Sequence, residues 1–560
     1  MIHEHSRMYK AAFSVLGMLM TAFILCAEKP VQQPGMSDNK MFSDDFEDAA
    51  RSTKTWVIGG SLLWSDRIEG RNPVFGDGFT GRGLMLSRTE TAGNVYYKRV
   101  FSADEIAVLK RSLVQVSLRM RVENISEKKT PWAGANVQCC FWTADVAKGS
   151  LEATIGNIRP GAFFPGGSFG WTNVSLIVAI PENTVAGVLN FGIEGTSGTV
   201  WYDDVKITVI QGEGTDDGWR PAPYQHGFGR LRGMMIFDPI TEDDLRELGE
   251  EWNANLVRYN FGGWDTKYFK KGLESADFDA QFSAAIERTD RIAAWCRKYG
   301  MYMVLDMMGT SQQGLFKSGA NQKRFIECWK TLVTRYRTNE VVLGYDLANE
   351  PHISEIAQRV SDDVIGWSDL AEKTSMEIRK IDPVKPIYIE GSSGGSPQGF
   401  LRLRPARVSN VIYSPHMYDP GHITHQGVLA STKAVGFEYP GRQGTAVYDK
   451  EYLERALKPA TDFQKKWNVP MLMGEFSCVR WAPNGSAARY ISDCIDIFEK
   501  YNWDWCFHSF REWQGWNPEY EADISVTNRA PYMTDRVKLL RSWFAKNKKP
   551  AWYTKAASVK

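Results

Sequence analysis

The sequence predicts two parts of different fold class: an all-β jelly-roll sandwich followed by a (β/α)8 TIM barrel. Residues 41–210 consist of short segments of alternating polarity separated by turn residues, a pattern typical of antiparallel strands. From residue 225 to residue 548, apolar strands alternate with amphipathic helices. Eight such units in this length fit a (β/α)8 barrel. A doubly wound open sheet is the alternative, but no glycine-rich phosphate loop follows the first strand.

The chain begins with a segment that predicts export. Arg7 and Lys10 precede an almost wholly apolar run, residues 11–27, and polar and acidic residues follow it at once. Residues 1–27 therefore indicate a secretory signal segment, and we expect a secreted, periplasmic or cell-envelope protein. A retained membrane anchor is an alternative, because the run is close to the lower limit for a span. Lipid attachment at Cys26 is disfavoured by the bulky residues before it.

The sandwich is expected at residues 41–210. Its clearest strands are residues 112–122, 171–180, 187–195 and 199–210, each of which alternates apolar and polar side chains. The glycine-rich, polar residues 211–224 are typical of a linker. The two parts should therefore form separate domains.

The barrel strands are short apolar runs, and the helices between them show helical spacing. In residues 279–300, Phe282, Ala285 and Ile292 recur on one helical face, and Gly300 ends the segment. The eight expected strands begin near Leu231, Asn255, Met301, Val341, Lys385, Asn410, Val469 and Trp503.

Polar side chains gather where these strands should end, which in a barrel is the position of the active site. Asp306 precedes the end of its strand by two residues, so we expect it to be structural. Arg258, Glu390 and His416 have alternative interpretations as an ion-pair partner, a loop cap and a core histidine. The full set is Arg258, Asp306, Asn349, Glu350, Glu390, His416, Tyr418, Glu475, His508, Arg511, Glu512 and Trp513.

Glu350 and Glu475 are the strongest candidates for chemistry, because each stands at the end of a buried apolar run. A carboxylate is costly to bury without a partner, so two of them on separate strands indicate a function. Cleavage of a glycosidic bond needs one acid to protonate the leaving oxygen and one carboxylate to meet the sugar carbon. No metal or cofactor is required, and the close pair His422 and His425 lacks an obvious carboxylate partner.

Composition narrows the class of partner. The chain has 67 Lys and Arg against 66 Asp and Glu, so its net charge of +1 does not point to nucleic acid or an acidic membrane surface. Its 20 Trp exceed what a core usually needs and would suit sugar rings. The 8 cysteines include no CxxC pair, so neither a disulfide framework nor a zinc–thiolate site is expected. We expect a monomer whose partner is a polysaccharide or oligosaccharide.

The segments LANEP (347–351) and GEF (474–476) resemble glycoside hydrolase family 5, the cellulase family within clan A. So do VRYNF (257–261), HMY (416–418) and PGHITHQG (420–427). The resemblance covers residues 227–543 and implies a retaining hydrolase of a β-1,4-linked glucan or mannan.

The resemblance also implies roles. Glu350 would be the acid/base and Glu475 the nucleophile, Asn349 would bind the sugar 2-hydroxyl, and His416 would line the cleft. Arg258 and Tyr418 would orient and ionise Glu475. Two positions depart from the family pattern: Met308 replaces a frequent histidine, and His508 replaces a frequent tryptophan floor. With the floor unassigned, His508 and Trp513 join the substrate-binding candidates.

In the first part, residues 42–48 and 195–207 resemble the carbohydrate-binding jelly rolls attached to many glycosidases. That resemblance implies a structural calcium held by Asp44, Asp45 and Asp204, with Glu47 as a further oxygen ligand. Surface acids at strand ends are the alternative interpretation, and the module could equally be a spacer. The candidate sugar platforms are Trp56, Trp64, Trp132, Trp142 and Trp171.

Three functions remain open from the sequence. The first is a secreted, retaining endo-β-glycanase. The second is a non-catalytic carbohydrate-binding protein, which the presence of both glutamates disfavours. The third is an exo-acting β-glycosidase on small glycosides, such as a β-glucosidase or β-mannosidase.

Overall fold

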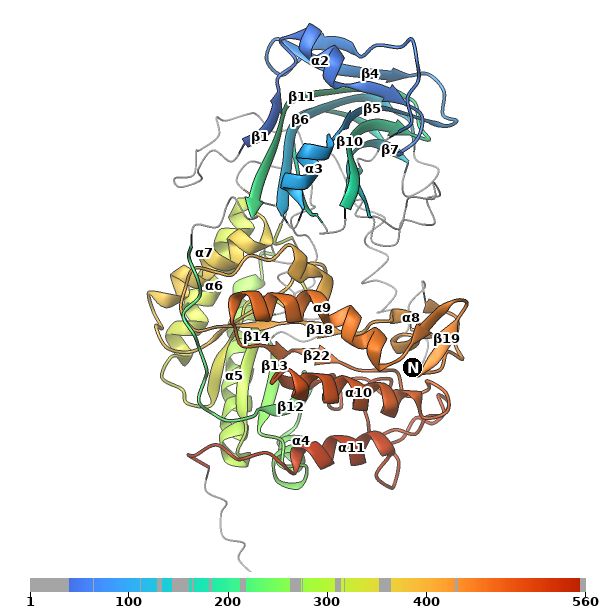
Figure 1. The fold of residues 1–560 in the computed structure, drawn as a ribbon. Coiled ribbons are helices and arrows are strands. Elements are labelled where there is room, and N and C mark those ends of the chain that lie inside the picture. The colour runs from blue at the N-terminus through green and yellow to red at the C-terminus, as the bar shows by residue number, and fades with distance from the viewer. Residues whose placement is uncertain are drawn as a thin grey trace, which may run out of the picture. The chain divides into compact units, whose positions relative to one another are not determined.

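The computed structural model describes residues 40–553, without residues 64, 111, 128–132, 144–160, 164–165, 181–183, 212–217, 262–272, 274, 308–313, 317, 352–363 and 429–431. The predicted signal segment, residues 1–27, and most of the predicted linker lie outside this part. The described chain divides into two compact units between Trp219 and Arg220 (Figure 1). We call them the sandwich unit and the barrel unit and describe each by itself. No helix among the described residues is long and apolar enough to cross a membrane.

The sandwich unit contains two antiparallel sheets. One has the order β3-β4-β11-β6-β9, with β1 paired to β11, and the other has the order β2-β5-β10-β7-β8. The strands are β1 (Lys40–Asp44), β2 (Val57–Gly59), β3 (Val74–Asp77), β4 (Arg82–Arg88), β5 (Asn94–Val100), β6 (Leu113–Ile125), β7 (Gly134–Thr143), β8 (Gly161–Phe163), β9 (Gly167–Ala179), β10 (Thr184–Glu194) and β11 (Gly198–Gln211). Two short helices, α2 (Ala49–Thr55) and α3 (Ala103–Leu109), accompany them.

Both sheets bury one face in the same hydrophobic core. In β6, Val114, Val116 and Leu118 alternate with polar residues and are buried. The second sheet adds Leu189 and Phe191 of β10 to this core. The alternation read from the sequence therefore does correspond to antiparallel strands with one buried face. Whether their connections are those of a jelly roll stays a prediction.

The barrel unit is a nearly closed ring of eight parallel strands, in the order β17-β16-β15-β14-β13-β12-β23-β21. An isolated bridge between Tyr413 and Met471 links the two ends of this order. The strands are β12 (Arg232–Ile236), β13 (Leu256–Phe261), β14 (Tyr302–Met307), β15 (Val342–Asp346), β16 (Ile387–Glu390), β17 (Val411–Ser414), β21 (Leu472–Met473) and β23 (Asp504–Phe507). The predicted barrel is confirmed, and the open-sheet alternative is wrong.

Helices separate the strands along the chain and surround them (Figure 1). The predicted helix at residues 279–300 is α5, and it ends where Gly300 adopts a left-handed φ of 69°. The helices are α4 (Glu242–Arg246), η5 (Glu247–Glu251), α5 (Phe278–Tyr299), α6 (Gly319–Tyr336), α7 (Trp367–Arg379), η7 (Pro397–Leu401), α8 (Gly421–Thr424), α9 (Lys450–Trp467), α10 (Ser486–Lys500) and α11 (Asp535–Phe544). A hairpin of β19 (Gly441–Gln443) and β20 (Ala446–Tyr448) precedes α9.

The sixth and seventh barrel strands are interrupted, which the apolar runs did not indicate. Each continues as a two-residue strand, β18 (His416–Met417) and β22 (Glu475–Phe476), and the two pair in parallel. In this register His416 lies opposite Glu475. The interruption therefore places two candidate site residues side by side at the C-terminal end of the ring.

Candidate active site

Arg258 of β13 is the centre of the site. Its guanidinium is fully buried and contacts four carboxylates: Asp306 at 3.1 Å, Asp346 at 2.9 Å, Glu390 at 2.7 Å and Glu475 at 3.0 Å. Burial alone would lower the pKa of Arg258, but these charges outweigh it and raise the pKa well above its usual value. Arg258 is therefore both a structural ion-pair partner, as one interpretation held, and a direct contact of Glu475.

Glu475 is held as an ionised carboxylate. Arg258 donates to Oε1, and the Tyr418 hydroxyl donates to Oε2 at 2.8 Å. Burial raises the pKa of Glu475, but the charges of His416, His508 and Arg258 and the Tyr418 hydrogen bond lower it to about 2. A carboxylate must be ionised to act as a nucleophile, and these contacts keep Glu475 in that state.

Glu350 follows β15 in a left-handed backbone conformation, with φ of 48°. Such a conformation is strained for a non-glycine residue and persists when neighbours fix it. Its backbone N–H donates to Glu390 Oε2 at 2.8 Å, and its Oε1 lies 3.0 Å from His416 Nδ1. Its side chain is 19% exposed, against 3% for Glu475. Glu350 is thus the more accessible carboxylate of the pair.

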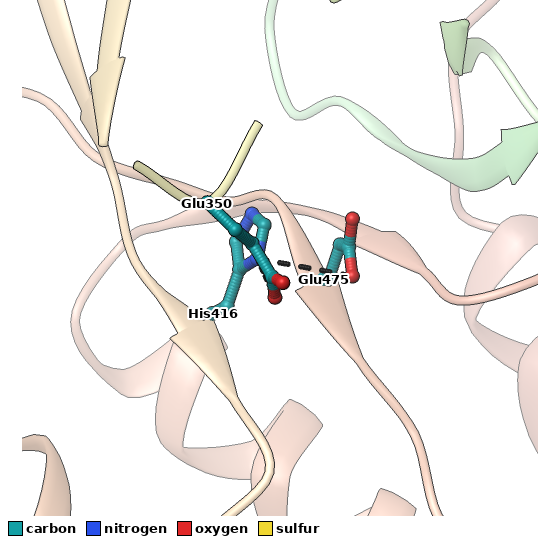
Figure 2. A group of neighbouring side chains, drawn as sticks. All are labelled: Glu350, His416 and Glu475. Atoms are coloured by element: carbon teal, nitrogen blue, oxygen red, sulfur yellow. Dashed lines mark hydrogen bonds and ion pairs between the residues drawn. The ribbon is translucent and has the colours of Figure 1, made fainter. Parts of the chain in front are cut away.

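Glu350, His416 and Glu475 are neighbours, and His416 Nδ1 lies close to both glutamates (Figure 2). One ligand atom each from Glu350, His416 and Glu475 lies within 4.8 Å of the others. His416 is buried, which lowers its pKa, but Glu390 and Glu475 outweigh burial and raise that pKa well above the usual value. A positively charged His416 beside Arg258 leaves this group poorly suited to a metal cation.

Asp306, Asp346 and Glu390 form a second buried group of potential ligand atoms. Arg258 contacts all three, so a positive charge already occupies the position that a cation would take. Asp306 also accepts a hydrogen bond from Asn260 at 2.5 Å. Its position supports the structural role expected for Asp306.

Asp346 is a site residue that sequence reasoning missed. Glu390 was a strand-end candidate with a loop cap as its alternative interpretation, and its contacts favour the site. Glu390 connects Arg258, His416 and the backbone of Glu350, and its pKa rises to about 7 because of burial and the nearby Asp346, against the effect of His416. The available signal was that both acids end buried apolar strands, as Glu350 and Glu475 do.

Asn349 and an aromatic group complete the site. Asn349 Oδ1 accepts from Arg258 Nη2 at 3.0 Å. His508 lies behind Tyr418, with its Nδ1 2.6 Å from the hydroxyl. Trp516, rather than Trp513, packs against both Tyr418 and His508, while Trp513 packs against Trp516 and Trp481.

Two of the other strand-end candidates have different surroundings. Arg511 pairs with Asp244, Glu247 and Glu519, so it is an ion-pair partner within the barrel unit. Glu512 instead contacts His508 at 3.0 Å. Met308 lies outside the described residues.

The predicted calcium ligands Asp44, Asp45 and Asp204 do not form a group of potential metal ligands among the described residues. Asp44 is buried, and its two oxygens already accept hydrogen bonds from Phe46, Arg51, Ser52 and Trp56. The Asp45 side chain is 62% exposed, and Asp204 is half-buried. Because these hydrogen-bond donors and the Arg51 guanidinium already occupy the Asp44 oxygens, Asp44 is better suited to hold α2 in place than to bind calcium.

The predicted tryptophan platforms differ in their exposure. Trp56 and Trp142 are fully buried, so neither offers an exposed face to a sugar. Trp171 is half-buried, and Trp64 and Trp132 lie outside the described residues.

Comparison with known proteins gives matches to the barrel unit. Residues 222–514, more than half of the chain, match the model for Cellulase (glycosyl hydrolase family 5). Endoglucanase C of Acetivibrio thermocellus is 28% identical over 295 residues, which cover 47% of this chain and 81% of the relative. Cellodextrinase A of Ruminococcus flavefaciens is 23% identical over 273 residues, 47% of this chain and 76% of the relative. The structure of Thermotoga maritima Cel5A with mannotriose shares 20% identity and a TM-score of 0.46, covering 57% of this chain and 100% of that one.

Proposed function

This chain belongs to glycosyl hydrolase family 5, the cellulase family, and from that premise we propose that it cleaves a β-1,4-linked glucan or mannan with retention of anomeric configuration. The enzyme class itself, a cellulase-like glycoside hydrolase, follows from the family. The proposal adds the mechanism and the substrate, and assigns Glu475 as nucleophile and Glu350 as acid/base.

The observation that carries the mechanism is the closeness of the two carboxylates. Glu350 and Glu475 place oxygens within 4.8 Å of each other. Retaining glycosidases hold their carboxyl groups about 5–5.5 Å apart, whereas inverting ones need about 6.5–9.5 Å to admit a water. The shorter separation favours a nucleophile that attacks the sugar directly.

In the first step Glu475 attacks the anomeric carbon while Glu350 donates its proton to the glycosidic oxygen. The carbon–oxygen bond to the leaving sugar breaks, and a glycosyl ester on Glu475 forms. Arg258 and Tyr418 hold the Glu475 carboxylate in position before the attack. Asn349, which accepts from Arg258, is the residue we assign to the 2-hydroxyl.

In the second step Glu350, now a carboxylate, takes a proton from water. The resulting hydroxide attacks the anomeric carbon, the ester bond to Glu475 breaks, and both glutamates return to their starting states. His416 contacts Glu350 and lies near Glu475, so it stays beside both groups through the cycle.

A substrate panel tests the assignment. The purified protein should release reducing sugar from a soluble β-1,4-glucan or mannan, and early products should be a mixture of oligosaccharides. Release of only mono- or disaccharide from the start would favour the exo-acting alternative, which the similarity to a cellodextrinase makes worth including. Binding to polysaccharides without release from any of them would overturn the proposal.

We also propose that the sandwich unit binds polysaccharide, as a module that holds the enzyme on its substrate. The proposal rests on the resemblance of residues 42–48 and 195–207 to carbohydrate-binding jelly rolls. Among the predicted tryptophan platforms that the structure describes, Trp171 of β9 is half-buried, whereas Trp56 and Trp142 are fully buried.

Replacing Trp171 by alanine should weaken retardation of the full-length protein in gels that contain soluble β-glucan or mannan. Hydrolysis of a small chromogenic glycoside should stay unchanged, because the barrel unit is untouched. Asn173→Ala, on the same strand, is the matched control and should migrate as the parent does. Equal retardation of all three proteins would contradict a binding role for Trp171.

Export through residues 1–27 and a monomeric state remain proposals. Mass spectrometry of the mature protein from the medium or envelope should show an N-terminus at Glu28.

A further inference from the structure

His508 lies immediately behind the hydroxyl that contacts Glu475. Its Nδ1 is 2.6 Å from Tyr418 Oη and 3.6 Å from Glu475 Oε2, and its Nε2 is 3.0 Å from Glu512 Oε2. The side chain is almost completely buried and packs against the rings of Phe237 and Trp516. The contacts form a continuous series from Glu512 through His508 and Tyr418 to Glu475.

The hydrogen-bond donors and acceptors in this series determine the protonation state of His508. Glu475 is an ionised carboxylate, so Tyr418 must use its one proton to donate to it. Tyr418 Oη then can only accept from His508, so Nδ1 carries a proton. Glu512 Oε2 already accepts from the Ser509 hydroxyl at 2.7 Å, so it faces Nε2 as an acceptor as well. Both ring nitrogens therefore donate, and His508 is an imidazolium.

The charges around His508 agree with that state. Burial lowers its pKa, but Glu475 and Glu512 outweigh burial and raise it, and Glu350 acts in the same direction. The other histidine nearby, His425, has its pKa lowered to about 4 by burial and by His508, so it stays neutral. Among the described residues, Tyr418, Glu475 and Glu512 contact His508, and His425 and Glu350 interact with it through charge.

We propose that His508 and Glu512 form a positioning pair for the nucleophile: Glu512 keeps His508 doubly protonated, and His508 holds the Tyr418 hydroxyl on Glu475 and places a positive charge beside it. The pair acts through Tyr418 and through charge, without contacting the sugar. This inference rests on the proposed role of Glu475 as nucleophile.

The pair has a consequence for pH dependence. When the pH rises through the pKa of His508, Nε2 loses its proton and its lone pair faces the Glu512 carboxylate. Glu475 then loses a neighbouring cation, and the hydrogen bond that holds Tyr418 loosens. The rate of the first chemical step should fall on the alkaline side.

Glu512→Gln and Glu512→Asp separate charge from packing. The glutamine side chain can donate a hydrogen bond to a neutral Nε2, so the contact with His508 is kept. The negative charge that favours the imidazolium is removed. We expect ¹⁵N-histidine NMR of the full-length protein at pH 7 to show His508 doubly protonated in the parent and in Glu512→Asp, and neutral in Glu512→Gln. The chain has 8 histidines, and the signal lost in His508→Gln assigns the resonance.

Presteady-state kinetics with a dinitrophenyl β-glycoside supply the functional measurement. The rate of the first step at neutral pH should fall about tenfold or more in Glu512→Gln, and most of it should return in Glu512→Asp. The matched control is Glu499→Gln. Glu499 contacts Arg232 and Trp505, the first residue of β12 and the second of β23, near the N-terminal ends of the strands. The first-step rate of Glu499→Gln should therefore match the parent.

Two outcomes overturn the pair. One is a neutral His508 in the parent at pH 7, and the other is an unchanged first-step rate in a folded Glu512→Gln. A fluorinated glycoside that traps the covalent intermediate distinguishes this failure from that of the proposed function. A label on Glu475 with unchanged Glu512→Gln kinetics rejects only the pair, whereas a label elsewhere rejects the assigned nucleophile.

Discussion

Glu475→Gln is expected to lower kcat by at least about 10⁴-fold on every substrate, because an amide cannot form the glycosyl ester. The fold should be retained. Glutamine has nearly the same shape, and Arg258 keeps its ion pairs with Asp306, Asp346 and Glu390. Steady-state hydrolysis of a polysaccharide and of an activated aryl glycoside measures the loss, and the circular dichroism spectrum checks the fold.

Leaving-group chemistry should not rescue this variant. An activated aryl leaving group removes the need for an acid, but it does not supply a nucleophile. Glu499→Gln is the matched control, with the same chemical change at a half-buried ion pair away from the site. A folded Glu475→Gln protein that keeps more than about a hundredth of parental kcat would contradict the assignment.

Glu350→Ala is the prediction with the second largest effect. Hydrolysis of substrates with poor leaving groups should fall by about 10²–10⁴-fold, because the proton donor is gone. Substrates with good leaving groups should still form the glycosyl ester, which then accumulates because no base activates water. Added azide, a nucleophile that needs no base, should restore turnover and yield a glycosyl azide of β configuration.

The corresponding Glu475→Ala variant gives the matched comparison. Azide that enters the space left by the nucleophile attacks from the opposite face and should yield a glycosyl azide of α configuration. The two products therefore assign the two glutamates independently of rates. An absence of azide rescue in Glu350→Ala would count against its role as acid/base.

The barrel could be predicted from the sequence because its signals are local. An apolar strand, or a helix such as α5 that ends at a glycine, is indicated by residues that are close in the sequence. The positions of Glu350 and Glu475 were predictable for the same reason. A carboxylate beside a buried strand is visible without knowing what lies opposite.

The ion pairs around Arg258 could not be predicted in this way. Arg258 is 88 residues from Asp346, 132 from Glu390 and 217 from Glu475, and no periodicity connects such distant positions. The sequence indicated that polar residues would meet at one end of a barrel. It did not show that one arginine would pair with four of them.

The interrupted strands and the buried tryptophans could not be predicted either, because they too depend on contacts between distant residues. The split that forms β18 and β22 depends on how two strands pair with each other, which the apolar runs do not record. Trp56 was a candidate sugar platform, but it is buried against Phe46 and Phe191 and donates to Asp44. Whether a tryptophan is exposed is decided by the packing of distant strands.

The assignments combine into one account of the site. Each glutamate is backed by a buried histidine and a further glutamate: His416 and Glu390 behind Glu350, and His508 and Glu512 behind Glu475 through Tyr418. Arg258 connects the two sides by contacting both Glu390 and Glu475. The positive charges keep Glu475 ionised, as the proposed nucleophile requires, while Glu350, the proposed proton donor, is the more accessible group.

The most direct test of this account is the anomeric configuration of the first product, followed by proton NMR during hydrolysis of a β-linked oligosaccharide. Direct attack by Glu475 followed by attack of water predicts that the β-anomer is released first and that the α-anomer appears later by mutarotation. Initial release of the α-anomer would mean a single displacement by water, and would contradict the role of Glu475 as nucleophile.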